Sequence, residues 1–177
     1  MNNTNWNLDP AHSEIGFKVK HMMITNVSGA FTDFNVEATS EGDDFTKGNI
    51  NFNAKTASVN TKSEQRDGHL RSPEFFDSEK YPEMKFKGTS YEKVSGDHYK
   101  LNGNLTIKDV TKPVSLDVEY GGVNKDPWGN TKAGFTLNGK INRKDFGLNW
   151  NAALETGGVM VSEEVKINAE IQLVKAQ

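Results

Sequence analysis

The side chains best suited to chemistry are concentrated in one stretch, RDGHLRSPEFFDSEKYP, at residues 66–82. It places arginines, a histidine and several carboxylates beside Phe75 and Phe76. Such a mixture is compatible with an active site, with the lid of a binding cavity, or with a capped helix that closes one end of a sheet. The secondary structure expected around this stretch is needed to choose among these three interpretations.

Motifs for metal binding, nucleophilic catalysis and phosphate binding are missing from the sequence. It contains no cysteine, and its histidines form no HExxH or HxH pair. There is no GxSxG, Walker A or GxGxxG pattern. Glu163 and Glu164 are neighbours on an expected strand, so they point to opposite faces and cannot act together. We therefore predict no catalytic residue, no metal, no cofactor and no enzymatic activity.

Length and charge limit the class of protein. The 177 residues fit one domain spanning 1–177, and the formal net charge of -3 gives no reason to expect nucleic acid as a partner. No apolar run approaches the roughly 20 residues of a membrane helix, so stable membrane insertion is not expected. The N-terminus shows no secretory signal pattern, which predicts a cytoplasmic location.

Alternation of apolar and polar residues with a period of two dominates the chain. Inward faces are predicted to carry the following sets: Ile15, Phe17, Val19 and His21; Ile50, Phe52 and Ala54; Leu105 and Ile107; Val114, Leu116, Val118 and Tyr120; Ala133, Phe135, Leu137 and Ile141; Val165, Ile167, Ala169, Ile171 and Leu173. One dry and one wet face is typical of an antiparallel sheet, and closure into a barrel removes exposed edges. A barrel of about eight strands either fills its interior or holds one small ligand. The sequence alone does not decide between a filled interior and one that holds a ligand.

Helix signals are confined to the middle of the chain, near residues 61–79. Thr61 and Glu64 fit a capping box, which predicts a helix from Lys62 to Arg71. Ser72 and Pro73 fit the cap and first position of a second helical segment. We therefore expect a helical insert between two strands, with Phe75 and Phe76 pointing inward.

Four stretches resemble a known family when taken in order: WNLDPAHSEIGFKVKH, RDGHLRSPEFFDSEKYPEMKF, GNLTIKDVTKPVSLDV and NRKDFGL. Together they are similar to the YceI-like family, the polyisoprenoid-binding, lipocalin-like proteins of bacteria, from Trp6 to about Val174. The resemblance implies an all-β, eight-stranded antiparallel barrel with an apolar tunnel for an isoprenoid chain, such as a polyprenyl phosphate or a quinone tail. It also allows a homodimer. Many members are exported to the periplasm, but this chain lacks their signal.

Strand parity and the insert predict the residues that contact such a ligand. The expected tunnel residues are Phe17, Val19, Met22, Met23, Phe31, Phe75, Phe76, Phe86, Leu105, Leu116, Phe135, Leu137, Trp150 and Ile167. A phosphate headgroup would favour cationic partners. The expected headgroup or mouth residues are His21, Arg66, His69, Arg71, Lys112 and Arg143. Asp67 is expected to buttress Arg143 or Arg66 instead of touching ligand.

Three functions follow as alternatives. The first is binding of an isoprenoid, or another long-chain apolar small molecule, for carriage or storage. The second is an enzyme that acts on an apolar substrate in the same lumen, which requires titratable side chains facing inward. The third is a stress-related structural protein with a filled barrel and no ligand.

Overall fold

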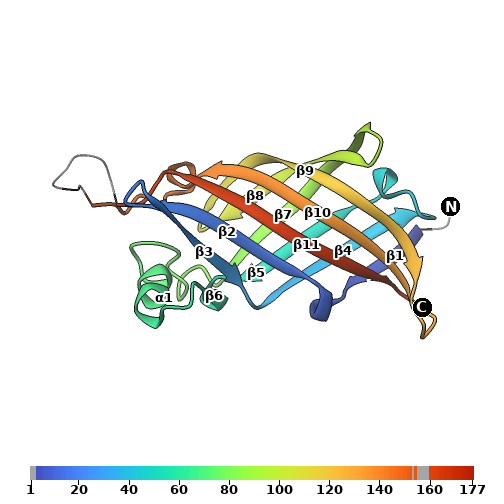
Figure 1. The fold of residues 1–177 in the computed structure, drawn as a ribbon, viewed down its shortest axis with the longest axis horizontal. Coiled ribbons are helices and arrows are strands. Elements are labelled where there is room, and N and C mark those ends of the chain that lie inside the picture. The colour runs from blue at the N-terminus through green and yellow to red at the C-terminus, as the bar shows by residue number, and fades with distance from the viewer. Residues whose placement is uncertain (1–2, 153, 155–159) are drawn as a thin grey trace.

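The computed structural model describes residues 3–152, 154 and 160–177, and almost all of them belong to strands or to the turns between strands (Figure 1). In chain order the elements are β1 (Asn3–Leu8), η1 (Pro10–His12), β2 (Glu14–His21), β3 (Thr25–Phe31), β4 (Phe34–Glu41), η2 (Phe45–Lys47), β5 (Ile50–Lys55), η3 (Thr56–Ser58), β6 (Val59–Asn60), α1 (Glu64–Arg71), β7 (Glu83–Ser95), β8 (His98–Ile107), β9 (Val110–Lys125), β10 (Thr131–Asn142), η4 (Arg143–Phe146) and β11 (Glu164–Lys175).

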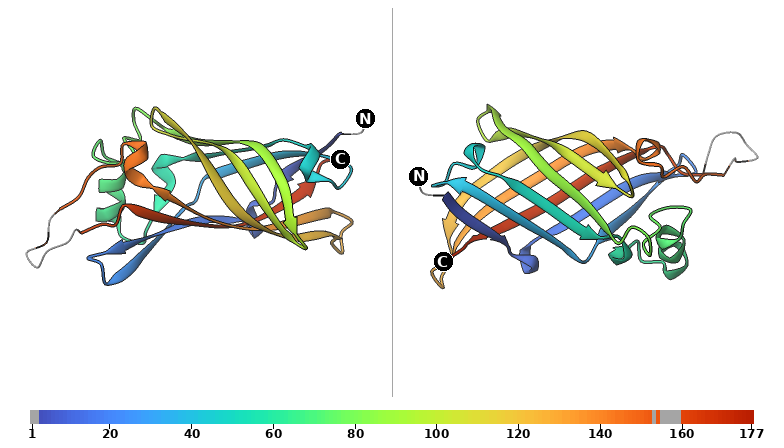
Figure 2. Two further views of the ribbon diagram at one scale, coloured as in Figure 1. Left: turned by 90° about the horizontal axis from the view of Figure 1, so that it is seen from above. Right: turned by 180° about the vertical axis from the view of Figure 1, so that it is seen from behind.

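Eight strands form a closed antiparallel barrel in the order β1-β4-β5-β7-β8-β9-β10-β11, and β11 pairs back onto β1. The barrel is elongated, with both chain termini near one end and α1 at the other (Figures 1 and 2). This confirms the predicted fold class. Closure leaves every strand of the ring with two neighbours, so no edge of the ring is left unpaired.

Strands β2, β3 and β6 extend the barrel wall toward α1. Both β1 and β2 pair with β11, but at different heights: Trp6 pairs with Lys175, whereas Phe17 pairs with Ile167. The short helix η1 marks the break between them. Strand β3 pairs with β2 along its length, and β6 covers only the end of β3, at Ala30 and Phe31. The wall is therefore incomplete beside β3, at the end where α1 lies.

The alternation expected from the sequence appears in the strands, with three register shifts, one of which lies between the pairs Lys93–Tyr99 and Ser95–His98. A bulge at Thr89 separates the pairs Gly88–Gly103 and Ser90–Asn102, so that Tyr91 faces inward with the apolar set. A second bulge, at Gly121, lets Tyr120 pair with Phe135. An extra residue in one strand moves every later side chain to the other face. The Thr89 bulge consequently adds the Tyr91 ring to the interior, where a strict period of two along β7 does not place it.

The insert between β6 and β7 contains one helix, α1, and its cap differs from the prediction. The hydroxyl of Ser63, not of Thr61, accepts the N–H of Arg66, so the helix begins at Glu64. The Thr61 hydroxyl instead donates to Asp67 at 2.6 Å. The predicted second helical segment is a series of turns, because the chain after Ser72 folds back and Phe76 donates its N–H to the carbonyl of Leu70. Within the part of the chain that the structure describes, no helix is long and apolar enough to cross a membrane.

Candidate functional site

The interior of the barrel is hollow. A cavity of about 650 Å³ extends along it, lined almost entirely by apolar side chains. Inward-facing residues such as Leu116, Leu137 and Ile167 are only half-buried although they lie inside the wall, because they face this empty volume. The volume falls in the usual range for small-molecule sites, about 300–1,000 Å³. Of the two possibilities left open by the sequence, the structure has the tunnel and not the filled core.

Aromatic rings close one end of the tunnel. We call this the closed end and define it by Trp6, Phe45, Tyr91, Tyr99, Tyr120 and Phe135. Phe45, on η2, lies 5.1 Å from Trp6 and 5.1 Å from Phe135, ring centre to ring centre. Trp6 is 1% exposed, and its indole N–H donates to Ser40 at 2.7 Å. Gly48 is required after η2, since a Cβ there would overlap the Thr39 carbonyl.

Tyr91 lies at the inner limit of the tunnel and has an unusual hydroxyl. The side chain is 7% exposed, and its oxygen has no hydrogen-bond partner among the described residues. Its ring stacks on Tyr99 at 4.7 Å. Burial raises the pKa of the Tyr91 phenol well above its ordinary value, and the nearby Tyr99 and Tyr120 act in the same direction. The hydroxyl therefore stays protonated and neutral, so the closed end carries no charge there.

The opposite end, which we call the mouth, is built around Lys20, His21, Arg66, His69 and Trp150, all of which line the cavity. The His69 ring packs edge-on against Trp150 at 4.7 Å and against Phe75 at 5.0 Å. Its Nε2 lies 2.9 Å from the Glu74 carboxylate. The insert thus places one polar ring among apolar ones where the tunnel meets solvent.

Arg143 fixes the chain around the mouth. It is 3% exposed, and its guanidinium donates to four backbone carbonyls: Leu148 at 2.6 Å, Trp150 at 2.8 Å, Ser162 at 2.7 Å and Val161 at 3.2 Å. Burial lowers the pKa of Arg143, and the Glu163 carboxylate opposes that shift. Most donors of the guanidinium are used in these contacts. Arg143 therefore positions Trp150 and the segment 160–162 more than it offers charge to a ligand.

Asp67 and Arg66 hold the start of the insert from two sides. Asp67 accepts the N–H of Thr61 at 2.9 Å, while Arg66 donates from Nε to the Thr61 hydroxyl at 2.7 Å and from Nη2 to its carbonyl at 2.8 Å. Asp67 supports Arg66 indirectly, because the Thr61 hydroxyl donates to the Asp67 carboxylate and accepts the Nε–H of Arg66. Arg66 is also one of the residues that line the cavity at the mouth.

The charge around the tunnel is one-sided. Among the described residues that line it, the charged ones are Lys20, Arg66 and Arg143, and none is Asp or Glu. Carboxylates lie behind this set: Asp67 is linked to Arg66 through the Thr61 hydroxyl, and Glu74 contacts His69. In the described ranges no group of three His, Asp or Glu side chains is arranged to hold a metal ion. The mouth thus presents positive charge although the whole chain has a net charge of -3.

The structure brings most predicted tunnel residues together. All of them line the cavity except Met22 and Met23: Phe17, Val19, Phe31, Phe75, Phe76, Phe86, Leu105, Leu116, Phe135, Leu137, Trp150 and Ile167. Met22 and Met23 are exposed in the turn between β2 and β3. Both have positive φ, which ends the strand alternation and turns them away from the interior. Direct contact of the twelve with a ligand stays a prediction.

Of the predicted headgroup residues, His21, Arg66, His69 and Arg143 line the cavity, whereas Arg71 and Lys112 do not. Arg71 follows Arg66 by five positions, roughly 140° around a helix at 100° per residue. It borders a separate polar depression with Thr32 and Ser58. Lys112 lies close to the turn between β8 and β9, and its side chain is exposed.

Four residues of the closed end were missed in the sequence, and Tyr99 is one of them although it alternates with Leu101 in HYKL. Tyr91 was missed because the Thr89 bulge reverses its parity, and Phe45 because it lies on a short 3-10 helix outside any strand pattern. For Trp6 the sequence does indicate an inward position, because Trp6 alternates with Leu8 among polar neighbours in NWNL. Bulges and single-turn helices leave little periodic trace.

Comparisons with known proteins agree with this architecture. A family model described as YceI-like domain matches residues 6–173. A UPF0312 protein of Staphylococcus aureus strain MSSA476 is 40% identical over 172 residues, which cover 96% of each chain. The crystal structure of a Campylobacter jejuni YCEI protein superimposes with a TM-score of 0.75 at 37% identity, covering 96% of this chain and 97% of that one. A polyisoprenoid binding domain from Saccharophagus degradans, at 13% identity, has the same fold, with a TM-score of 0.68 and coverage of 97% and 98%.

Proposed function

This chain belongs to the YceI-like family, and on that premise we propose that it binds an isoprenoid lipid in the barrel tunnel, for carriage or storage. The observation that carries the proposal is the apolar cavity of about 650 Å³, closed at one end and basic at the other. The polyisoprenoid binding domain with the same fold supports the choice of ligand class.

An isoprenoid chain suits this tunnel because nearly all of its surface is apolar. Burial of that surface contributes roughly 25 cal/mol per Å². The tunnel side chains that alternate along β11 extend from Val165 to Leu173. Eight steps of roughly 3.3 Å give a path of about 26 Å along the strand, long enough for an extended lipid tail.

The mouth favours a polyprenyl phosphate over a quinone. Arg66 lines it without a carboxylate among the described lining residues, and charge-assisted contacts to phosphate oxygens are strong. A neutral quinone ring would give this cation no charged partner. The role proposed is binding without catalysis. The homodimer and the cytoplasmic location stay predictions.

The proposal can be tested by native mass spectrometry of delipidated protein incubated with a polyprenyl phosphate, with a polyprenol of equal chain length and with a quinone. We expect a one-to-one adduct. Leu137→Trp fills the tunnel and should weaken uptake of all three ligands at least about tenfold, since overpacking displaces a bound tail. Asn138→Trp is the matched control, because Asn138 is the next residue on β10 and is exposed. Protein that takes up none of the three would overturn the proposal.

The headgroup preference has its own control pair. Arg66→Gln should weaken binding of the phosphate relative to the polyprenol by roughly tenfold, since hydrogen bonds to charged groups contribute about 1.5–3 kcal/mol. Arg71→Gln should leave that ratio unchanged, because Arg71 lies outside the cavity lining. Taking the ratio removes any effect of Arg66→Gln on the insert itself, where Arg66 also binds Thr61. An unchanged ratio for Arg66→Gln would favour a neutral headgroup.

A further inference from the structure

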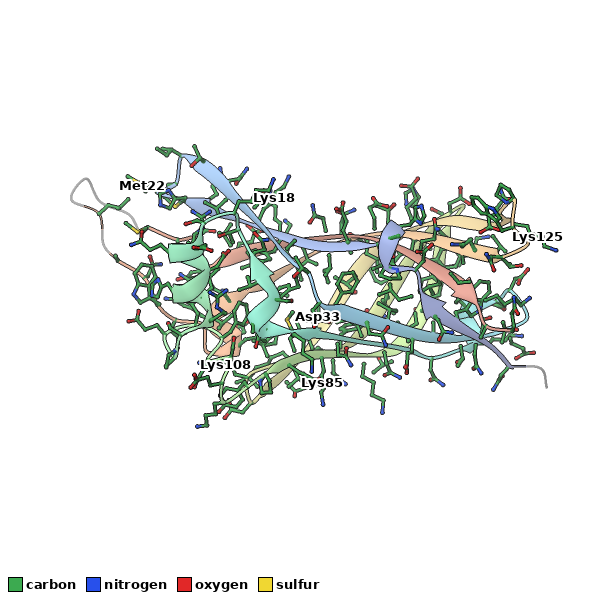
Figure 3. The ribbon with its side chains drawn as sticks, turned by 90° about the horizontal axis from the view of Figure 1, so that it is seen from below. Lys18, Met22, Asp33, Lys85, Lys108 and Lys125 are labelled. Atoms are coloured by element: carbon green, nitrogen blue, oxygen red, sulfur yellow. The ribbon has the colours of Figure 1, made fainter. Side chains whose placement is uncertain are left out.

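The turn between β2 and β3 exposes three apolar residues in succession. Met22, Met23 and Ile24 are 39%, 53% and 75% exposed, and we call them the β2–β3 tip. The tip projects at the α1 end of the barrel, far from Lys125 at the other end (Figure 3). Its base is part of the mouth, since Met22 donates its N–H to Met160 and His21 pairs with Val161. Contiguous exposed apolar residues of this kind mark interaction sites.

Backbone geometry gives no reason for methionine at these positions. The N–H of Ile24 donates to the carbonyl of His21, which closes a turn whose central residues, Met22 and Met23, have φ of 54° and 63°. Hairpin turns with two positive φ values strongly prefer Asn-Gly. Two methionines are therefore a poor local choice for stability. Departures from local rules without compensation inside the fold are expected at functional sites.

A row of lysines crosses the outer surface of the barrel and begins at Lys18, four residues before Met22. Lys18, Lys166 and Lys140 lie directly opposite one another across β2, β11 and β10. All three are exposed, and Glu164 contacts Lys140 at 3.4 Å. Like charges placed opposite each other destabilise a sheet, so this row does not serve the fold. Within residues 14–31 the acidic side chain is Glu14, at the base of the hairpin, whereas Lys18 and Lys20 lie toward the tip.

We propose that the β2–β3 tip and the neighbouring lysines dock the protein on the surface of an anionic lipid bilayer, with the tunnel mouth against the membrane. Apolar side chains that enter the interface together with basic residues that attract anionic lipid are how peripheral proteins bind membranes. A lipid would then pass between bilayer and tunnel without crossing water. Docking itself needs no occupied tunnel, so it does not depend on the proposed function.

Flotation with vesicles tests the proposal. The full chain should float with phosphatidylcholine vesicles that contain phosphatidylglycerol, and less with phosphatidylcholine alone. The variant Met22→Asn with Met23→Gly and Ile24→Thr should bind about tenfold more weakly or worse, because it loses most of the apolar surface of the tip. It should also unfold at an equal or higher temperature, since Asn-Gly fits the turn. Loss of binding in a better-folded protein cannot be attributed to misfolding.

Trp128→Ser is the matched control for apolar exposure. Trp128 is 83% exposed in the turn between β9 and β10, at the opposite end of the barrel, and its removal should leave flotation unchanged. For charge, Lys18→Gln should weaken binding to anionic vesicles about fivefold, from roughly 1 kcal/mol per lysine near the surface. Lys93→Gln, near the closed end, should have no effect.

Three results would overturn the proposal: wild-type protein that does not float, a tip variant that floats equally well, or dependence on Trp128 in place of the tip. Any of them would assign the exposed methionines to another partner, such as a protein. Leu137→Trp separates this result from the proposed function. It should lose lipid uptake but keep flotation, whereas the tip variant should keep uptake of lipid supplied in detergent.

Discussion

The two ends of the barrel are closed by different means. At the closed end, aromatic rings from strands and from η2 pack on one another, and the buried Tyr91 hydroxyl, which has no hydrogen-bond partner among the described residues, is neutral. At the mouth, the chain between strands is held by a buried cation, Arg143, which contacts only backbone carbonyls among its hydrogen-bond partners. The closed end depends on packing. The mouth depends on hydrogen bonds from one side chain, whose removal would leave backbone carbonyls without a donor.

This difference matches what each end has to do. Interlocked rings exclude water and give a ligand tail nothing to pass through. A mouth must admit a lipid, so its segments cannot be buried by strand pairing on both sides. Hydrogen bonds from Arg143 position Trp150, and Trp150 in turn packs on His69 of α1. The insert is thereby connected to Arg143 through Trp150 at the mouth.

Arg143→Ala should have the largest effect on stability. It removes the Arg143 donors from the carbonyls of Leu148, Trp150 and Ser162, whereas the Val161 carbonyl still accepts the Asn151 amide. It also opens a cavity beside Leu148, so the free energy of unfolding should fall by about 3–5 kcal/mol. Chemical denaturation followed by fluorescence measures it. Arg143→Lys should recover less than half of the loss, because an ammonium cannot reproduce the planar fork.

Lys144→Ala is the control for this comparison. Lys144 is adjacent in sequence but half-exposed, with an ion pair to Glu163 at 2.9 Å, and should change the free energy of unfolding by no more than about 0.5 kcal/mol. If Arg143→Ala costs less than about 1 kcal/mol, the mouth does not depend on this cation and the contrast between the two ends disappears.

A smaller effect is expected from Asp9, which joins the break between β1 and β2 to the strands near the closed end. The Lys132 ammonium, at 2.5 Å, is the main cause that lowers the pKa of Asp9 from 3.8 to about 2, with help from His12 and Gln172. Because the folded pKa lies below the unfolded value, the stabilisation is complete above about pH 4–5 and is lost as the pH falls toward 2. With an allowance for solvent screening it amounts to about 1–2 kcal/mol.

Asp9→Asn should therefore lower the free energy of unfolding at pH 7 by that amount and should flatten its fall between about pH 4 and pH 2. Denaturation series at several pH values measure both. Asp109→Asn, in the exposed turn between β8 and β9, should leave the curve unchanged. If wild type and Asp9→Asn show the same pH dependence, Asp9 does not contribute to stability at this end of the barrel.

The sequence predicts the wall of this barrel better than it predicts either end. Along β11, from Val165 to Leu173, apolar and polar residues alternate without interruption, and each apolar residue of this segment lines the cavity. The ends depend on features without a period. Ser63 caps α1 in place of Thr61, and the Thr89 bulge reverses the parity of Tyr91. Met22 and Met23 look like tunnel residues until the positive φ of the turn is known.

The smallest effect is expected at Tyr91, and its sign is informative. A buried hydroxyl without a partner forfeits hydrogen bonds that it makes to water in the unfolded chain. Tyr91→Phe removes that hydroxyl while keeping the ring that stacks on Tyr99, so the free energy of unfolding should rise by up to about 1 kcal/mol. Tyr99→Phe is the control, because Tyr99 is only half-buried and should change little. Thermal and chemical denaturation measure the difference. A decrease for Tyr91→Phe would mean that the hydroxyl has a partner, such as an ordered water, and that the closed end is not as dry as its packing indicates.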